Sequence, residues 1–158
     1  MARRVYEGTV NVYFATAVAD ISAPTVAEIT AATDITCFLT KDGFAPNINT
    51  NNVDSAALCD VYDGQIPGSF GADVTLTMFR DDATPEDAWD LVVYGQTGFL
   101  IVEPFGEPGV LPVAGDKVEV YEGAWHQKSP GNTAANTQQT FTAAFPTVRI
   151  DFDALVSS

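Results

Sequence analysis

Residues 73–80 alternate strictly between polar and apolar side chains, which is the pattern of a β-strand with one buried face. One face carries Asp73, Thr75 and Thr77, and the other carries Val74, Leu76 and Met78. Successive side chains of a strand point to opposite faces of a sheet, so the apolar set is expected in the core and the polar set in water. The pattern predicts a half-buried strand with a polar face.

Short apolar or alternating runs recur along the rest of the chain, with turn-forming residues between them. Strands are predicted over residues 8–15, 35–40, 57–62, 99–102, 116–121 and 141–152. One face of the first strand is expected to be buried, and Pro146 is expected to divide the last strand or to place it at a sheet edge. The pattern indicates a mainly β protein that forms a single domain over residues 1–158.

One well-defined α-helix is predicted at about residues 85–94. Its start and stop signals are Thr84, Pro85, Glu86, Asp87 and Gly95. The threonine can cap the helix, the proline suits its first turn, the acids favour its positive end and the glycine can close it.

A second, shorter helix is predicted over residues 22–29. Thr25 and Glu28 have the spacing of a capping box, in which each side chain accepts a hydrogen bond from the backbone of the other residue. Pro24 is expected in its first turn.

Three segments are predicted outside the regular elements: the N-terminal residues 1–7, a long loop at 41–54 and a polar arm at 127–139. The long loop contains a glycine, a proline and four asparagines, and the arm is similarly polar. Long loops in compact domains tend to be functional, so both are candidates for contacts with other chains.

The charge balance excludes some partners. Seven Lys and Arg against 21 Asp and Glu give a formal net charge of -14, which opposes binding to nucleic acid or to an anionic membrane. No stretch approaches the roughly eighteen consecutive apolar residues of a membrane span. Ordinary solubility explains such a charge, and so does a surface past which DNA must move without adhering.

Cys37 and Cys59 are the two cysteines, and each falls in a run predicted as a strand. We expect two buried, reduced thiols. A disulfide would require the two strands to be neighbours, and two cysteines are too few for a disulfide-dense secreted scaffold or a four-ligand zinc site.

The sequence lacks the common catalytic motifs, including HExxH, the P-loop, GxGxxG, GxSxG and the EF-hand loop. His126 is the single histidine and is expected at the surface or at an interface. The predicted helix start is rich in acids, namely Asp81, Asp82, Glu86, Asp87 and Asp90. A cation or acid/base site is one interpretation, but acids also stabilise a helix N-terminus on their own. We therefore predict a protein that is not an enzyme and has no cofactor.

An ordered set of short fragments resembles a known family. The fragments are residues 23–25, 33–36, 38–44, 53–54, 65–68, 79–82, 87–90, 94–95, 97–99 and 115–121. In this order they resemble the major tail tube protein of long-tailed, non-contractile bacteriophages, especially those that infect actinobacteria. The likeness covers most of the chain.

The resemblance implies a β-sandwich or barrel-like core flanked by a helix. It also implies a structural virion protein that forms hexameric rings, which stack into the phage tail tube through which DNA is ejected. The implied partners are other copies of the chain, a tape-measure protein and a tail-terminator protein, with DNA passing through unbound. Its expected location is the virion tail, assembled in the host cytoplasm.

Candidate site residues follow from these expectations. The polar strand face of Asp73, Thr75 and Thr77 is expected to face the lumen of the tube. Contacts between subunits are expected from Lys41, Phe44, Asn47, Asn49, Asn52, Asp54, Lys128, Asn132 and Asn136. The alternative is a non-catalytic β-sandwich binding module, such as a virion decoration or receptor-binding domain. An enzyme with an unfamiliar carboxylate site is a third interpretation.

Overall fold

The structure is a computed structural model that describes residues 8–82 and 86–158. Its elements are β1 (Asn11–Ala15), α1 (Val26–Ala31), β2 (Thr33–Asp34), β3 (Leu39–Asp54), β4 (Gln65–Phe79), α2 (Asp87–Leu91), β5 (Thr97–Glu103), β6 (Lys117–Ala124), β7 (Ser129–Pro130) and β8 (Thr140–Leu155). The N-terminal residues 1–7, and the expected helix signals Thr84 and Pro85, lie outside the described residues.

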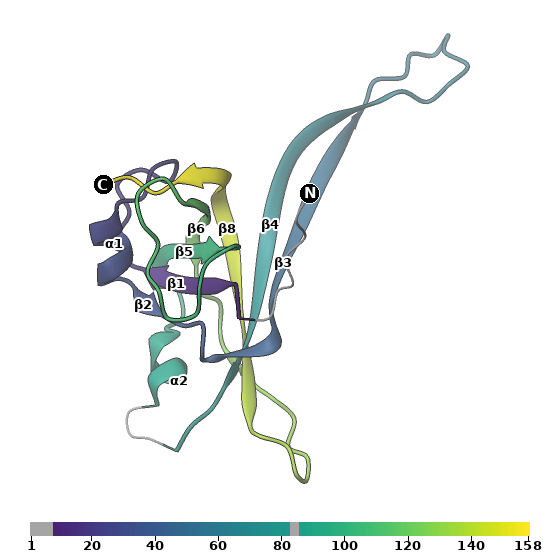
Figure 1. The fold of residues 1–158 in the computed structure, drawn as a ribbon. Coiled ribbons are helices and arrows are strands. Elements are labelled where there is room, and N and C mark those ends of the chain that lie inside the picture. Colours follow the sequence, from purple (N-terminus) through teal and green to yellow (C-terminus); the bar gives the residue numbers. More distant parts are fainter. Residues whose placement is uncertain (1–7, 83–85) are drawn as a thin grey trace.

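The strands form one antiparallel order, β2-β1-β5-β6-β8-β4-β3, with β7 beside β8. The long strand β8 holds this order together, because residues 140–146 pair with β4 and residues from Thr147 onward pair with β6. Figure 1 shows that β1 and β5 run across the direction of β3 and β4, so the sheet folds over onto itself. The result is the expected mainly β, sandwich-like fold.

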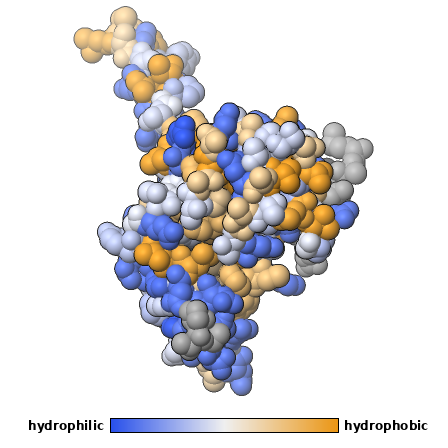
Figure 2. All heavy atoms as spheres, turned by 90° about the vertical axis from the view of Figure 1, so that its left-hand side faces the viewer, coloured by the Kyte–Doolittle hydropathy of each residue, from blue (hydrophilic) through white to orange (hydrophobic). Residues whose placement is uncertain are grey.

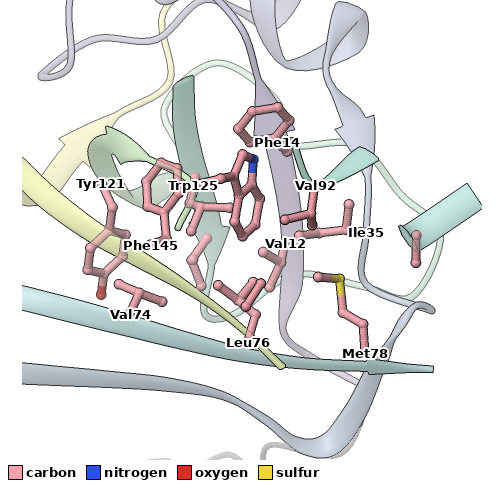
Figure 3. Close-up of a cluster of buried hydrophobic side chains, with 14 of the residues drawn as sticks. Val12, Phe14, Ile35, Val74, Leu76, Met78, Val92, Tyr121, Trp125 and Phe145 are labelled. Carbon is pink, nitrogen blue, oxygen red and sulfur yellow. The ribbon is translucent and has the colours of Figure 1, made fainter. Parts of the chain in front are cut away.

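The main core lies between the two parts of this folded sheet. Val74, Leu76 and Met78 of β4 are fully buried there, as the alternation of residues 73–80 predicts. Phe14 and Phe145 pack around Trp125, with ring centroids 5.4 and 5.0 Å from the indole (Figure 3). These apolar and aromatic contacts fix the position of β4 against β1.

Strand β1 is buried on both faces, whereas its alternation predicts one buried face. Val12 and Phe14 enter the main core, and Tyr13 and Ala15 enter a second cluster on the opposite side. Helix α1 contributes Ile29 to that second cluster. The helix therefore covers the face of β1 that would otherwise be wet.

The capping box at α1 is confirmed. The Thr25 hydroxyl accepts a hydrogen bond from the Glu28 N–H at 3.2 Å, and the Glu28 carboxylate accepts one from the Thr25 N–H at 2.8 Å. That backbone hydrogen bond is the main reason why the pKa of Glu28 is lowered. Pro24 precedes the cap instead of lying in the first turn, and the helix runs two residues beyond the predicted end.

Helix α2 is confirmed as an element but is shorter than predicted. It ends at Leu91 because Val92 takes an extended backbone conformation and is buried in the main core. Gly95 has a φ of +79° and donates its N–H to the Trp125 carbonyl, so it closes the following turn and not the helix. The burial of Val92 therefore outweighs the local sequence signals for a longer helix.

The prediction of a long loop at residues 41–54 is wrong, because these residues belong to strand β3. The strand pairs with β4 from Phe44 opposite Leu76 to Asp54 opposite Gln65. This pairing with a distant segment provides hydrogen-bond partners for the backbone of β3. Pro46, which lacks an N–H, is tolerated because β3 pairs on one side only within the described residues.

The prediction of a strand at residues 57–62 is also wrong. The segment belongs to the turn region between β3 and β4. The two cysteines are free, as expected, but Cys37 and Cys59 are both exposed and not buried. Residues 127–139 are mostly loop as predicted, apart from β7.

The bend of β8 depends on a close approach between two strands. Any Cβ at Gly123 of β6 would clash with the backbone carbonyl of Pro146, where β8 passes from β4 to β6. We expect Gly123→Ala to lower the free energy of unfolding by about 1–3 kcal/mol, because overpacked sites force the backbone to shift.

The matched control for this prediction is Gly71→Ala, since a Cβ at Gly71 of β4 meets no atom within 4 Å. Its free energy of unfolding should change by less than about 0.5 kcal/mol. Urea unfolding of both variants measures the difference, and equal midpoints would contradict the importance of the Gly123 contact.

Candidate assembly surface

The β3–β4 hairpin is the most conspicuous surface feature. Strands β4 and β8 stay paired as far as Asp73 opposite Pro146, and beyond that point β4 pairs only with β3 among the described residues. Figure 1 shows the hairpin projecting away from the rest of the fold after this separation. An arm of this length contributes little to the core of its own subunit.

Apolar side chains are exposed along the hairpin and above all at its end. Ile48, Val53, Ile66 and Phe70 are each about half exposed or more along the two strands. We call Leu58, Val61 and Tyr62 the hairpin tip; their relative exposures are 108%, 92% and 86%. Figure 2 shows apolar atoms at the far end of the projecting arm. Exposed apolar groups gathered in this way are typical of an interaction surface.

The separation of β4 from β8 also leaves strand edges open. Residues 65–72 of β4 pair only with β3, and residues 147–155 of β8 pair only with β6, within the described part of the chain. The outer edge of β3 is likewise unpaired there. Rows of unpaired N–H and C=O groups can accept a strand from another chain.

The base of the hairpin is anchored by an aromatic contact. Phe44 of β3 is half-buried and meets Tyr121 of β6 edge to face, with ring centroids 6.0 Å apart. Tyr121 donates its hydroxyl to the Glu119 carboxylate at 2.9 Å, and burial raises its pKa. Beside these residues lies a groove of about 390 Å³ between β3 and the neighbouring strands.

The structure separates the predicted contact residues into two groups. Lys41, Asn47, Asn49, Asn52 and Asp54 are exposed on β3, and Asn132 and Asn136 are exposed in the 127–139 segment. Phe44 and Lys128 instead make contacts within their own subunit. The predicted lumen residues lie on the face of β4 opposite the core, with Asp73 exposed and Thr75 and Thr77 half-buried.

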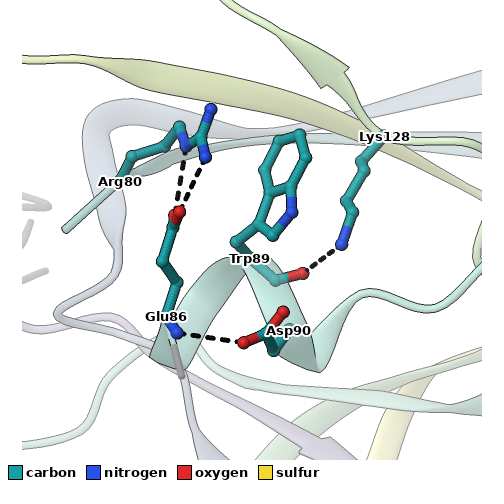
Figure 4. Close-up of polar contacts among 5 residues, drawn as sticks. All are labelled: Arg80, Glu86, Trp89, Asp90 and Lys128. Atoms are coloured by element: carbon teal, nitrogen blue, oxygen red, sulfur yellow. Dashed lines mark hydrogen bonds and ion pairs between the residues drawn. The ribbon is translucent and has the colours of Figure 1, made fainter. Parts of the chain in front are cut away.

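Lys128 belongs to a cluster that holds α2 against the sheet (Figure 4). Its ammonium donates to the Trp89 carbonyl at 2.6 Å and lies 4.3 Å from the centroid of the Trp89 ring. Arg80 lies 4.2 Å from the same ring and forms two hydrogen bonds to Glu86. The indole is thus contacted by two cations.

The same cluster accounts for part of the acidic helix start. The hydrogen bonds from Arg80 are the main reason why the pKa of Glu86 is lowered. The Asp90 carboxylate accepts the Glu86 N–H at 2.9 Å, so it acts on the helix backbone. Among the described residues, no group of three or more His, Cys, Asp or Glu side chains is placed to hold a metal ion.

We predict that Lys128→Met destabilises the subunit. The variant keeps the apolar stem but loses the hydrogen bond and the cation–π contact, so the free energy of unfolding should fall by about 1 kcal/mol. Asn132→Ala, in the exposed part of the same segment, is the control and should leave it unchanged. Thermal or urea unfolding measures both. Unchanged stability of the lysine variant would contradict an internal role.

A buried polar pair ties the 104–115 segment to β1. The Asn11 side-chain amide donates to the Glu103 carboxylate and to the Glu107 carbonyl, each at 3.0 Å. Both side chains of the pair are buried, and burial raises the pKa of Glu103. Gly106 leaves the space that this carboxylate fills. The pair fixes a segment that exposes Phe105, Val110 and Val113.

Sequence reasoning missed the hairpin tip. Its apolar residues resemble a buried strand, because exposure of Leu58, Val61 and Tyr62 is unexpected for a subunit considered alone. The signal that could have found them is their position: Asp60 interrupts the apolar run, and Asp63 and Gly64 follow it, as turn residues do.

The protein is thus mainly β and carries a projecting hairpin with exposed apolar side chains. A protein family described as "Phage tail tube protein" matches residues 1–154 of the chain. The chain belongs to this phage tail tube family and is a structural component of a phage tail.

A structural comparison agrees on the fold. A chain of the cryo-EM structure of the anti-feeding prophage baseplate, 6-fold symmetrised, is similar with a TM-score of 0.57 and 14% sequence identity. The similarity covers 96% of both chains. A search of curated proteins found no match.

No helix in the described part of the chain is long and apolar enough to cross a membrane.

Proposed function

We propose that this chain self-assembles into six-membered rings that stack into the phage tail tube, the conduit for DNA during ejection. Membership of the tail tube family supports this proposal, and the β3–β4 hairpin is the observation that carries it. A paired arm that exposes apolar side chains at its end is suited to reach a neighbouring subunit. The family match favours a tube over a decoration or receptor-binding module.

The open strand edges support a route to ring closure. An exposed edge of one subunit can pair with an exposed edge of the next, and repetition of that contact around a closed ring leaves neither of these two edges open. The outer edge of β3 and residues 147–155 of β8 are the two long candidates in each subunit. Tape-measure and tail-terminator proteins remain the expected partners, with assembly in the host cytoplasm.

The polar face of β4 is our candidate for the lumen. The residues opposite Asp73, Thr75 and Thr77 on neighbouring strands are Ala45, Asn47, Thr142, Ala144 and Pro146. These are short and uncharged, so none offers a cation to a phosphate. Six chains at -14 each would give a ring a formal charge of -84 before counterions, which opposes adhesion of DNA.

We expect shortening of the hairpin to abolish tubes without unfolding the subunit. Replacing residues 50–70 by Asn-Gly would join Asn49 to Gly71, which are paired across the hairpin, through a two-residue turn. Negative-stain electron microscopy should show tubes of the unmodified chain, and none of the shortened chain, in moderate salt that screens like charges. Normal tubes from the shortened chain would remove the hairpin from the assembly mechanism.

The lumen placement has a separate test. Asp73→Lys should leave tubes intact but reduce DNA ejection, because a ring of cations would then line the path of the phosphates. Asp20→Lys makes the same change of charge at an exposed position before α1, so it serves as the control. Ejection from phage carrying each variant is the measurement, and unchanged ejection with Asp73→Lys would contradict the placement.

A further inference from the structure

Two aspartates of the chain are followed directly by a glycine, and the structure places the two pairs in different surroundings. Asp42 and Gly43 lie in strand β3, whereas Asp63 and Gly64 lie just beyond the end of the β3–β4 ladder. An Asp-Gly pair is prone to backbone rearrangement, because glycine has no Cβ to hinder attack of its nitrogen on the aspartate side chain. The surroundings of each pair therefore decide which one reacts.

The pair beyond the ladder has both reacting groups accessible. Asp63 is exposed, and within the described part of the chain its carboxylate accepts no hydrogen bond. The nearby carboxylates of Asp54 and Asp60 differ, since each accepts a backbone N–H, at 2.9 and 2.7 Å. Gly64 is held through its carbonyl, which accepts the Ser55 N–H at 2.8 Å, and no described group accepts a hydrogen bond from its own N–H.

The pair in β3 has the same two residues but no room to react. Gly43 is buried, and any Cβ there would clash with the Thr77 carbonyl of β4 and with the backbone of Thr40. Ring formation requires the glycine nitrogen to turn toward the aspartate side chain, which moves this closely packed backbone. Strand β3 must therefore open locally before Asp42 can react, at a free-energy cost that a segment outside the ladder does not have.

We propose that Asp63 is a site of spontaneous isomerisation to isoaspartate. The Gly64 nitrogen attacks the side-chain carboxyl carbon, and the new N–C bond closes a five-membered succinimide ring. One carboxyl oxygen leaves as water, which carries away the carboxyl proton and the amide proton. Water then adds to one of the two ring carbonyls. Opening at the side-chain carbonyl restores aspartate, and opening at the main-chain carbonyl gives isoaspartate.

The product differs from aspartate in its backbone and not in its mass. The main chain now runs through the former side-chain carbons, so it gains one backbone atom and carries a free α-carboxylate. Nothing is oxidised or reduced, and the water released in the first step is taken up in the second. The change remodels the turn where it enters β4 and leaves the paired strands in place. Because the reaction needs only the subunit and water, it is independent of the proposed function.

Digestion with an endoproteinase that cuts before aspartate tests the site, because this enzyme does not cut before isoaspartate. After prolonged warm incubation of the folded chain at neutral pH, isomerisation of Asp63 should yield an uncut peptide of residues 60–72. The same change at Asp42 would yield residues 34–53. We expect the first peptide to accumulate at least about tenfold faster, because β3 must open locally. In urea, which removes this protection, the two rates should become similar.

The matched control is Gly64→Ala, which keeps the aspartate but adds a Cβ that hinders attack by the nitrogen. The new Cβ would meet the Ser55 hydroxyl at 3.0 Å, and that short side chain can turn away, so the variant should fold. Its peptide of residues 60–72 should accumulate several times more slowly. Absence of this peptide from the unmodified chain would overturn the proposal. Equal accumulation of both peptides from the folded chain, or an unchanged rate in Gly64→Ala, would also overturn it.

Discussion

The pairing of β8 with two successive partners is the constraint on which the rest of the structure depends. Its first half completes the β4 side of the sheet and its second half completes the β6 side, with the transfer at Pro146. The close approach of Gly123 to that proline allows the sheet to fold over and enclose the aromatic core. At the same point β4 is released from β8, so the bend that makes the core also frees the hairpin.

The two halves of the molecule therefore have different physical tasks. The folded sheet buries its apolar side chains, and buried polar side chains such as Asn11 and Glu103 are hydrogen-bonded to each other. The hairpin leaves both apolar side chains and backbone edges exposed, an arrangement that favours aggregation in a subunit meant to remain alone. In the proposed tube the same exposure becomes useful, because neighbouring subunits would cover it. The strongly negative charge of the chain restrains unspecific association before that happens.

The elements that the sequence predicts correctly are those determined by nearby residues. The alternation of residues 73–80 identifies a half-buried strand, and Thr25 with Glu28 identifies the start of α1. Strand β3 escapes prediction because its asparagines and proline favour a turn locally, and only pairing with β4, up to 39 residues away in the chain, makes it a strand. Helix α2 is shortened by the burial of Val92, which depends on the whole core.

The candidate assembly surface is likewise predictable from the sequence only in part. Polar exposure of the Asn47–Asp54 region can be predicted from composition, but the internal role of Lys128 requires knowing that Trp89 lies beside it. The hairpin tip is misread because its composition is that of a buried strand, although its surroundings are solvent. A surface that other copies would cover, as the proposed assembly requires, has the composition of a core when the sequence is considered one chain at a time.

A cryo-EM reconstruction of tubes assembled from the purified chain tests the central claim most directly. The account predicts that the β3–β4 hairpin lies buried between subunits, with its end against a neighbouring chain. Tubes in which the hairpin projects freely into solvent from the outer wall, touching no neighbouring subunit, would contradict it.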